Sequence, residues 1–141
     1  MFQTMNKPTA AYGMVGLDMN VDAADPHKLI LMLFDGAIFA VAAATSCAQK
    51  RDLKSMSKEI LKASNIISEG LRDSLDTSVG GDLAARLASL YDYMCVRLQA
   101  ANLKGNQAIL NEVNLLLIEL RGGWEEIAND PAVHSRTKAA A

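Results

Sequence analysis

Few residues of this chain could catalyse a reaction or bind a metal ion, and their spacing does not indicate a common site. The only histidines are His27 and His134, and neither follows a glutamate by three residues, as the paired metal-binding motifs of di-iron helical bundles require. Cys47 and Cys95 lie far apart and form no C-x-x-C pair, so zinc has no recognisable ligand set. The sequence also contains no glycine-rich phosphate loop and no G-x-S-x-G motif. We therefore predict no catalytic, cofactor-binding or metal-binding residue.

An enzyme that binds an anion through arginines in a helical core is the chemical alternative. The candidates for such a site are Arg72, Arg86, Arg97 and Arg121. Because arginine is rarely buried without a partner, we expect these side chains to lie on the solvated face instead. Asp35 and Asp92 are likewise expected to be solvent-facing or pairing carboxylates. The absence of motif chemistry predicts that the protein is not an enzyme.

The composition of the 141 residues narrows the class of protein further. The net charge is −2 and lysines and arginines form no cluster, which argues against binding to nucleic acid. Half of the residues are apolar but only 5% are aromatic, and prolines number three, so a helical core of aliphatic side chains is favoured. The N-terminus lacks a charged region followed by an apolar one, so we predict a cytoplasmic protein with reduced, buried cysteines.

The elements that must position these residues are predicted to be four helices. Asp25 and Pro26 give a helix start, and the first helix runs to about residue 48. Apolar residues at spacings of three and four predict further helices over about 53–75 and 83–104, the latter after Gly80-Gly81, and over about 106–127 after a stop at Gly105. We predict an all-α, antiparallel four-helix bundle over 25–128, with an N-terminal arm at 1–24 and a loose C-terminal tail at 129–141.

The first helix is long and apolar enough to span a membrane, but three features argue against insertion. Asp35 interrupts the run, no Trp/Tyr belt flanks it, and the other three helices need an apolar partner. One of its faces, which carries Leu29, Leu33, Ala37, Ala40 and Ala44, is expected to lie inside the bundle. A second apolar face carries Leu31, Phe34, Ile38 and Ala42. Two alternatives remain for it: cover by local chain, or a groove that binds a helical partner.

Several segments, taken in order, resemble the flagellin-specific export chaperone family. They are Tyr12 in the arm, DPHKLILMLFDGAI at 25–38, KASNIISEGLRDSLD at 62–76, GGDLAARLASLYDYMCVRLQAANL at 80–103 and EVNLLLIELRGGWEEI at 112–127. The resemblance implies a cytoplasmic four-helix chaperone, without catalysis or cofactor, that binds the C-terminal segment of unpolymerised flagellin. It also implies delivery of flagellin to the flagellar export apparatus, with an export-gate protein and an anti-sigma factor or other regulator as further partners.

The partner-binding residues expected from these arguments are Tyr12, Leu31, Phe34, Ile38, Ala42 and Tyr93. Tyr12 matches the tyrosine of the family's N-terminal arm. Tyr91 and Tyr93 lie two positions apart on one helix and cannot share a face, so we place Tyr91 nearer the core and Tyr93 nearer the rim. A competing function is a structural bundle whose extra apolar face pairs with a second copy, and a weak homodimer stays open.

Overall fold

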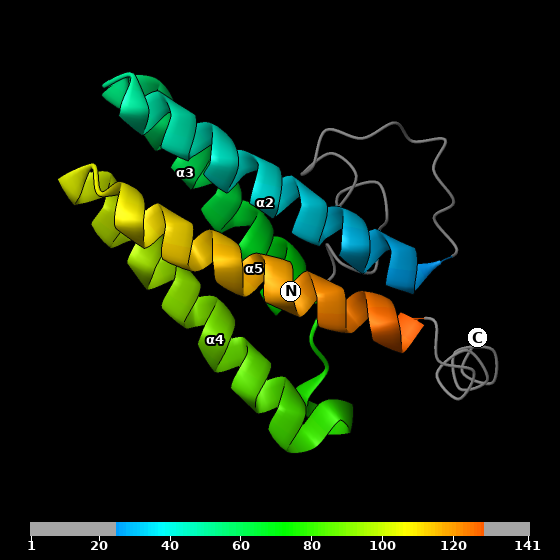
Figure 1. Ribbon diagram of the computed structural model, residues 1–141. Helices are drawn as coiled ribbons and strands as arrows, with labels where there is room; N and C mark the ends of the chain where they lie inside the picture. The colour runs from blue at the N-terminus through cyan, green and yellow to red at the C-terminus, as the bar shows by residue number, and fades with distance from the viewer. Residues whose placement is uncertain (1–24, 129–141) are drawn as a thin grey trace.

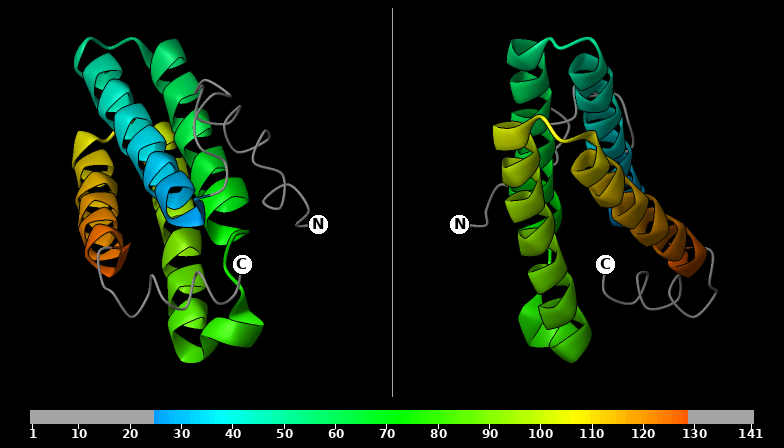
Figure 2. Two further views of the ribbon diagram at one scale, coloured as in Figure 1. Left: turned by 90° about the vertical axis from the view of Figure 1, so that its right-hand side faces the viewer. Right: turned by 60° about the vertical axis from the view of Figure 1, so that its left-hand side comes forward.

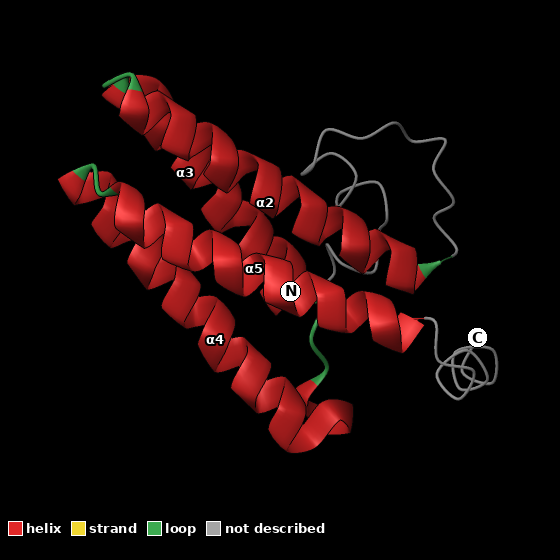
Figure 3. Ribbon diagram, in the orientation of Figure 1, coloured by secondary structure: helices red, strands yellow, loops and turns green. Residues whose placement is uncertain are grey.

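The structure is a computed structural model, and it describes residues 25–128 (Figure 1). The predicted arm at 1–24, which includes Tyr12, and the predicted tail at 129–141 lie outside these residues. The helices are α2 (Pro26–Gln49), α3 (Leu53–Asn65), α4 (Thr77–Lys104) and α5 (Gln107–Ala128). A π-helical segment, η2 (Ile66–Arg72), continues α3 directly. Within 25–128 every element is helical, and no strand is present (Figure 3).

The four helices form an up-and-down bundle, as predicted. The α2–α3 pair and the α4–α5 pair are two hairpins with short connections, and consecutive helices run in opposite directions (Figure 2). α2 packs against both α3 and α5, and α4 closes the bundle by packing against α5, α3 and η2. In Figure 1, α5 lies between α2 and α4. The all-α fold class is therefore confirmed.

The helix ends are set by the residues that the sequence indicated. The Asp25 carboxylate accepts a hydrogen bond from the Lys28 N–H at 3.2 Å, with Pro26 at the first helical position. Gly105 has a φ of 60° after the last turn of α4, a left-handed conformation that glycine adopts readily. The Asn106 side chain then accepts from the Ala108 N–H at 2.9 Å and from the Ile109 N–H. These caps fix where α2 and α5 begin and where α4 ends.

The core is aliphatic and draws on every helix. α2 contributes eight buried residues, including the five that were predicted to face the interior: Leu29, Leu33, Ala37, Ala40 and Ala44. This burial explains the apolar composition of α2, which is the one helix among residues 25–128 with the length and hydropathy of a membrane span. A helix that packs into a protein core can have the same length and hydropathy, and α2 buries eight of its residues here.

Two predicted helices differ in detail from the structure. The expected second helix over 53–75 is α3 followed by η2, in which Ile66, Ile67, Gly70 and Leu71 are all buried. The connection expected at Gly80-Gly81 is helical up to Gly80, and the break falls at Gly81, whose φ of 58° and ψ of −133° are accessible to glycine.

The apolar stripes of α4 and α5 also lie differently from the prediction at their ends. Leu83, the first apolar residue of the helix predicted over 83–104, is exposed, since it follows the break directly. In α5 the deepest residues are Leu110, Val113 and Leu117, and Ile127, the last apolar residue of the predicted helix, is exposed. The interior ends before the last turn of α5, which explains the second difference.

Candidate functional site

α2 has a second apolar face, but not all four of the predicted residues lie on it. Leu31 and Ile38 are half-buried and Ala42 is exposed. Phe34 is only 2% exposed and belongs to the core, so its placement on this surface was wrong. With 3.6 residues per turn, Phe34 lies close to the buried Val41 and Ala37 positions, and the edge of the core extends around α2 far enough to include it.

The reason that Leu31 and Ile38 are half-covered is the position of α5. The Trp124 ring stacks on the His27 ring with 4.8 Å between centroids, and the indole N–H donates to the His27 carbonyl at 3.0 Å. Further along, the Arg121 guanidinium pairs with the Asp35 carboxylate. Leu31 lies one turn from both His27 and Asp35, so it lies on the edge of α2 that meets α5.

α5 supplies apolar side chains beside this edge. Ile118 precedes Arg121 by one turn, and because α5 runs antiparallel to α2 it lies alongside the part of α2 that follows Asp35. Ile118 is 49% exposed and Leu115, one turn earlier, is 62% exposed. We call the group of Leu31, Ile38, Ala42, Leu115 and Ile118 the α2–α5 surface.

Leu115 and Ile118 were not identified from the sequence. The signal was the run LLLI at 115–118, which contains more consecutive apolar residues than one helical stripe can bury. Phe39 was also missed; it is 71% exposed, one turn beyond Asp35 on the outer side of α2. Its position four residues after a solvent-facing aspartate would have indicated this exposure.

Tyr93 lies on a different edge of the bundle. As predicted, Tyr91 is buried and Tyr93, at 44% exposed, is at the rim. The Tyr93 hydroxyl donates to the Glu112 carboxylate at 2.5 Å, and the Arg97 guanidinium donates to the same carboxylate at 2.8 Å. These two hydrogen bonds lower the pKa of Glu112. The structure thus ties Tyr93 to the α4–α5 edge, and does not bring it together with Leu31 and Ile38.

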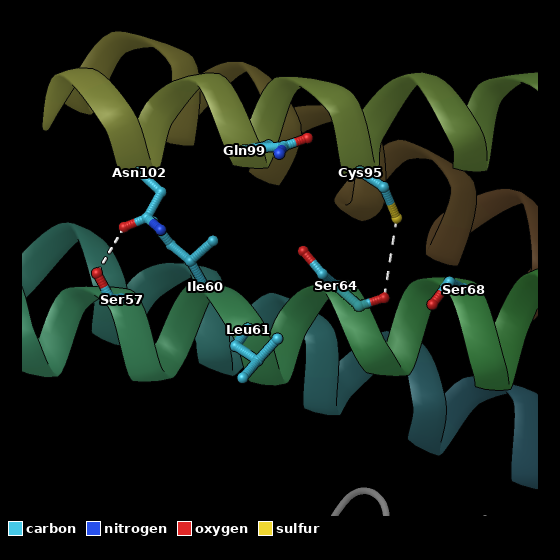
Figure 4. A pocket seen from close by; sticks show the side chains of 8 residues that line it. All are labelled: Ser57, Ile60, Leu61, Ser64, Ser68, Cys95, Gln99 and Asn102. Carbon is cyan, nitrogen blue, oxygen red and sulfur yellow. Dashed lines mark hydrogen bonds between the residues drawn. The ribbon is translucent and has the colours of Figure 1, made fainter.

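A second surface is a groove of about 350 Å³ between α3–η2 and α4 (Figure 4). It is lined by three serines and by other small or uncharged residues, and we call it the serine groove: Ser57, Ile60, Leu61, Ser64, Ser68, Cys95, Gln99 and Asn102. The Ser57 hydroxyl is 2.6 Å from the Asn102 amide oxygen, which closes one end. The Cys95 thiol donates to the Ser64 carbonyl at 3.8 Å, and its burial raises its pKa. No titratable carboxylate or amine lines this groove.

The arginines considered as anion ligands do not converge. Arg72 pairs with Asp92, Arg97 with Glu112, and Arg121 with Asp35 and Glu125, all at the surface, while Arg86 is exposed. Among residues 25–128, no three His, Cys, Asp or Glu side chains gather as metal ligands would. The described part of the chain instead exposes apolar side chains on α2 and α5 and neutral polar side chains in the serine groove.

The comparisons with known proteins agree with the resemblance. The model of the flagellar protein FliS family matches residues 8–131. The flagellar secretion chaperone FliS of Salmonella typhimurium is 40% identical over 118 residues, which cover 84% of this chain and 87% of that protein. FliSB of Pseudomonas aeruginosa is 37% identical over 123 residues (87% and 97%), and FliS of Bacillus subtilis is 32% identical over 107 residues (76% and 78%). The chain therefore belongs to the FliS family, and the relatives that it matches are flagellar secretion chaperones.

Proposed function

We propose that this protein is a cytoplasmic export chaperone that binds the C-terminal segment of unpolymerised flagellin. In this role it prevents premature polymerisation and assists the delivery of flagellin to the flagellar export apparatus. The observation that carries the proposal is the α2–α5 surface, where large apolar side chains of two adjacent helices remain accessible beside each other. Family membership supports a flagellar client, and the accessible apolar side chains of the α2–α5 surface support binding on this side of the bundle.

The geometry of the α2–α5 surface favours a helical client. Leu31, Ile38 and Ala42 recur at helical spacing on α2, and Leu115 and Ile118 do so on α5, so they form two roughly parallel apolar rows. An amphipathic helix binds such a surface by placing its own apolar stripe between the rows. Ordering a disordered client costs about 2–5 kcal/mol, so several apolar contacts must form together.

Other expected partner contacts rest on the family and not on the described geometry. We propose an export-gate protein and an anti-sigma factor or similar regulator as further partners. Tyr12 in the arm and Tyr93 at the α4–α5 edge remain proposed partner-binding residues, not assigned to one of these partners. Tyr93 is accessible, but its hydroxyl is already bonded to Glu112, so a partner would contact mainly its ring. The net charge of −2 argues against nucleic acid as a partner.

The test is isothermal titration calorimetry with the C-terminal segment of flagellin from the same organism. Saturable one-to-one binding with a large negative heat-capacity change is expected, because apolar surface is buried. Ile38→Asp and Ile118→Asp should each weaken binding by at least about tenfold, since a charge would be buried against apolar client atoms. Leu83→Asp is the matched control, because Leu83 is an exposed leucine outside the α2–α5 surface.

Two outcomes would contradict the proposal. If the wild-type protein gave no binding heat at several temperatures and did not co-elute with the segment, flagellin would not be its client. If the wild-type protein instead sedimented as a stable dimer whose dissociation followed Ile38→Asp and Ile118→Asp, the α2–α5 surface would serve self-association. Circular dichroism of each variant confirms that the bundle remains folded.

A further inference from the structure

Asn114 on α5 carries a buried polar atom without a hydrogen-bond partner. Its side-chain oxygen, Oδ1, is shielded from solvent and accepts from no donor within residues 25–128, although the residue as a whole is half-buried. Most buried polar side-chain atoms in folded proteins have a partner, because an unpaired one loses its hydrogen bonds to water without replacement. Such an atom lowers stability, and a function is one reason for a protein to retain it.

Asn114 lies on the side of α5 that meets α2. It precedes Arg121 by about two helical turns, so the two side chains point the same way, and Arg121 pairs with Asp35 of α2. The two helices run antiparallel (Figure 1), so two turns back along α5 correspond to two turns forward along α2, next to Ala42. Asn114 therefore lies within the α2–α5 surface, between Ala42 of one row and Ile118 of the other.

The facing row of α2 offers this oxygen no free donor in the described part of the chain. Ile38 and Ala42 are apolar, and the next residue of the row, Thr45, donates its hydroxyl to the Val41 carbonyl of its own helix at 3.0 Å. Backbone N–H groups in the middle of a helix are occupied as well, since each is bonded to the carbonyl four residues earlier. The composition of the row thus explains why Oδ1 of Asn114 has no partner.

The Asn114 amide can turn toward the α2–α5 surface without breaking a hydrogen bond of its oxygen. Because nothing pairs Oδ1 between the helices, a change of the χ1 rotamer moves the amide outward at no such cost. The outward amide offers one acceptor and two N–H donors in the middle of an otherwise apolar surface. A client helix that covers this surface therefore covers a single polar group.

A single polar group in an apolar interface selects the register of the helix that packs on it. In coiled coils an asparagine at one core position specifies register at a cost in stability. A client helix displaced by one turn would place an apolar side chain over the amide and leave it buried and unpaired. In the matching register a client hydroxyl or side-chain amide pairs with it, whereas a charged side chain would pay to leave water.

We infer that Asn114 fixes the register of the client helix on the α2–α5 surface by hydrogen bonding to an uncharged polar side chain of the client. This inference rests on the proposed function and names a residue that determines its specificity. The apolar rows supply affinity in any register, since apolar contacts are not directional, whereas Asn114 distinguishes one register from another. The free protein then retains a destabilising amide because the complex uses it.

Paramagnetic broadening measures the register directly. A nitroxide is attached at Phe39→Cys, an exposed position on the outer side of α2, in a Cys47→Ser, Cys95→Ala background. Isotope-labelled C-terminal flagellin segment is added, and the client amides that broaden identify the residues beside the label. We expect one short broadened stretch when Asn114 is present, and a displaced stretch or several stretches with Asn114→Leu. The same single stretch in both proteins would overturn the inference.

Stability and affinity should respond to Asn114→Leu in opposite directions. The urea midpoint of the free protein should rise, because an unpaired polar group is removed, while client binding weakens about three- to tenfold, as the loss of one hydrogen bond does. Asn65→Leu is the matched control: this exposed asparagine of α3 makes no capping hydrogen bond, so its midpoint should rise less and affinity should not change. Asn114→Ala repeats the test without added volume. A lower midpoint in both Asn114 variants, or wild-type affinity in both, would overturn the inference.

A double-mutant cycle connects Asn114 to its partner on the client. Each residue of the broadened client stretch is changed to alanine and titrated against wild type and Asn114→Leu. One uncharged polar position should weaken binding to wild type but not to Asn114→Leu, because its partner is already removed. Additive losses at every position would contradict the hydrogen bond. Failure of the wild-type protein to bind the segment would refute the proposed function, whereas binding that does not depend on Asn114 would refute this inference alone.

Discussion

The indole N–H of Trp124, near the end of α5, donates a hydrogen bond to the backbone carbonyl of His27, in the first turn of α2. The two rings also stack, with an interplanar angle of 29°. This pair joins segments 97 positions apart in the chain and fixes α5 along the edge of α2. The α2–α5 surface owes its two apolar rows to this alignment.

Trp124→Phe is therefore expected to destabilise the bundle. The ring contact with His27 is largely kept, but the hydrogen bond to the carbonyl is lost, which costs about 0.5–1.5 kcal/mol. Urea unfolding followed by circular dichroism measures this change. Ile127→Ala, an exposed position one turn further along, serves as the control and should change stability by less than about 0.5 kcal/mol. Equal stability of Trp124→Phe and wild type would mean that this bond contributes nothing.

Phe34 and Ile38 should respond differently to truncation, although both are apolar residues on α2. Phe34 is fully packed, so Phe34→Ala leaves a cavity and should cost about 3–5 kcal/mol. Ile38 is half-buried, so Ile38→Ala should cost about 1 kcal/mol and reduce client binding more than stability. Chemical denaturation of both variants, beside the calorimetric titration, separates the two effects. A larger loss of stability for Ile38→Ala would reverse the assignment of core and surface.

The glycines offer a matched pair of backbone tests. Gly122 lies within α5 without a left-handed φ, and an added Cβ there meets no atom within 4 Å, so Gly122→Ala should stabilise by about 0.5–1 kcal/mol. Gly81 has a φ of 58°, so Gly81→Ala is strained and should destabilise by about 1 kcal/mol or more. Thermal unfolding of the two variants should move the midpoint in opposite directions. A fall in the midpoint for Gly122→Ala would indicate that this glycine has a packing role.

Alkaline pH should destabilise the protein through Tyr91. Burial raises the pKa of its hydroxyl from 10.0 to about 12, so the folded state keeps the proton that the unfolded state releases. The contribution of Tyr91 to the free energy of unfolding is fully present below pH 10 and is lost as the pH rises through about 12. Urea unfolding across this pH range should show that the free energy of unfolding falls less steeply with pH for Tyr91→Phe than for wild type. Identical slopes for the two proteins would mean that Tyr91 is accessible to solvent, and tyrosinate absorbance provides an independent check.

Arg121 has two carboxylate partners, Asp35 on α2 and Glu125 on its own helix, and this should make single substitutions mild. Asp35→Asn and Glu125→Gln should each cost less than about 0.5 kcal/mol, since surface ion pairs contribute little and one partner remains. The double variant should lose more stability than the two single variants together, and added salt should reduce this excess loss. Additive effects in a double-mutant cycle would show that the two carboxylates act independently.

The sequence determined the helices and most of their ends, because these depend on short-range features. Helical periodicity located the four elements, and Asp25, Gly105 and Asn106 terminate or begin helices through contacts within a few residues. It also predicted the inner face of α2, since a stripe at helical spacing faces a core in any bundle. The family followed from ordered segments that span nearly the whole chain.

The tertiary structure alone decided which apolar residues remain accessible. How far a core extends around each helix depends on where the neighbouring helices lie, and no local pattern records this. Phe34 is therefore buried while Leu31 and Ile38 are half-covered, and Leu115 and Ile118 join them from a helix about eighty positions away in the chain. The serine groove likewise exists only where α3–η2 faces α4, because its two walls come from separate segments.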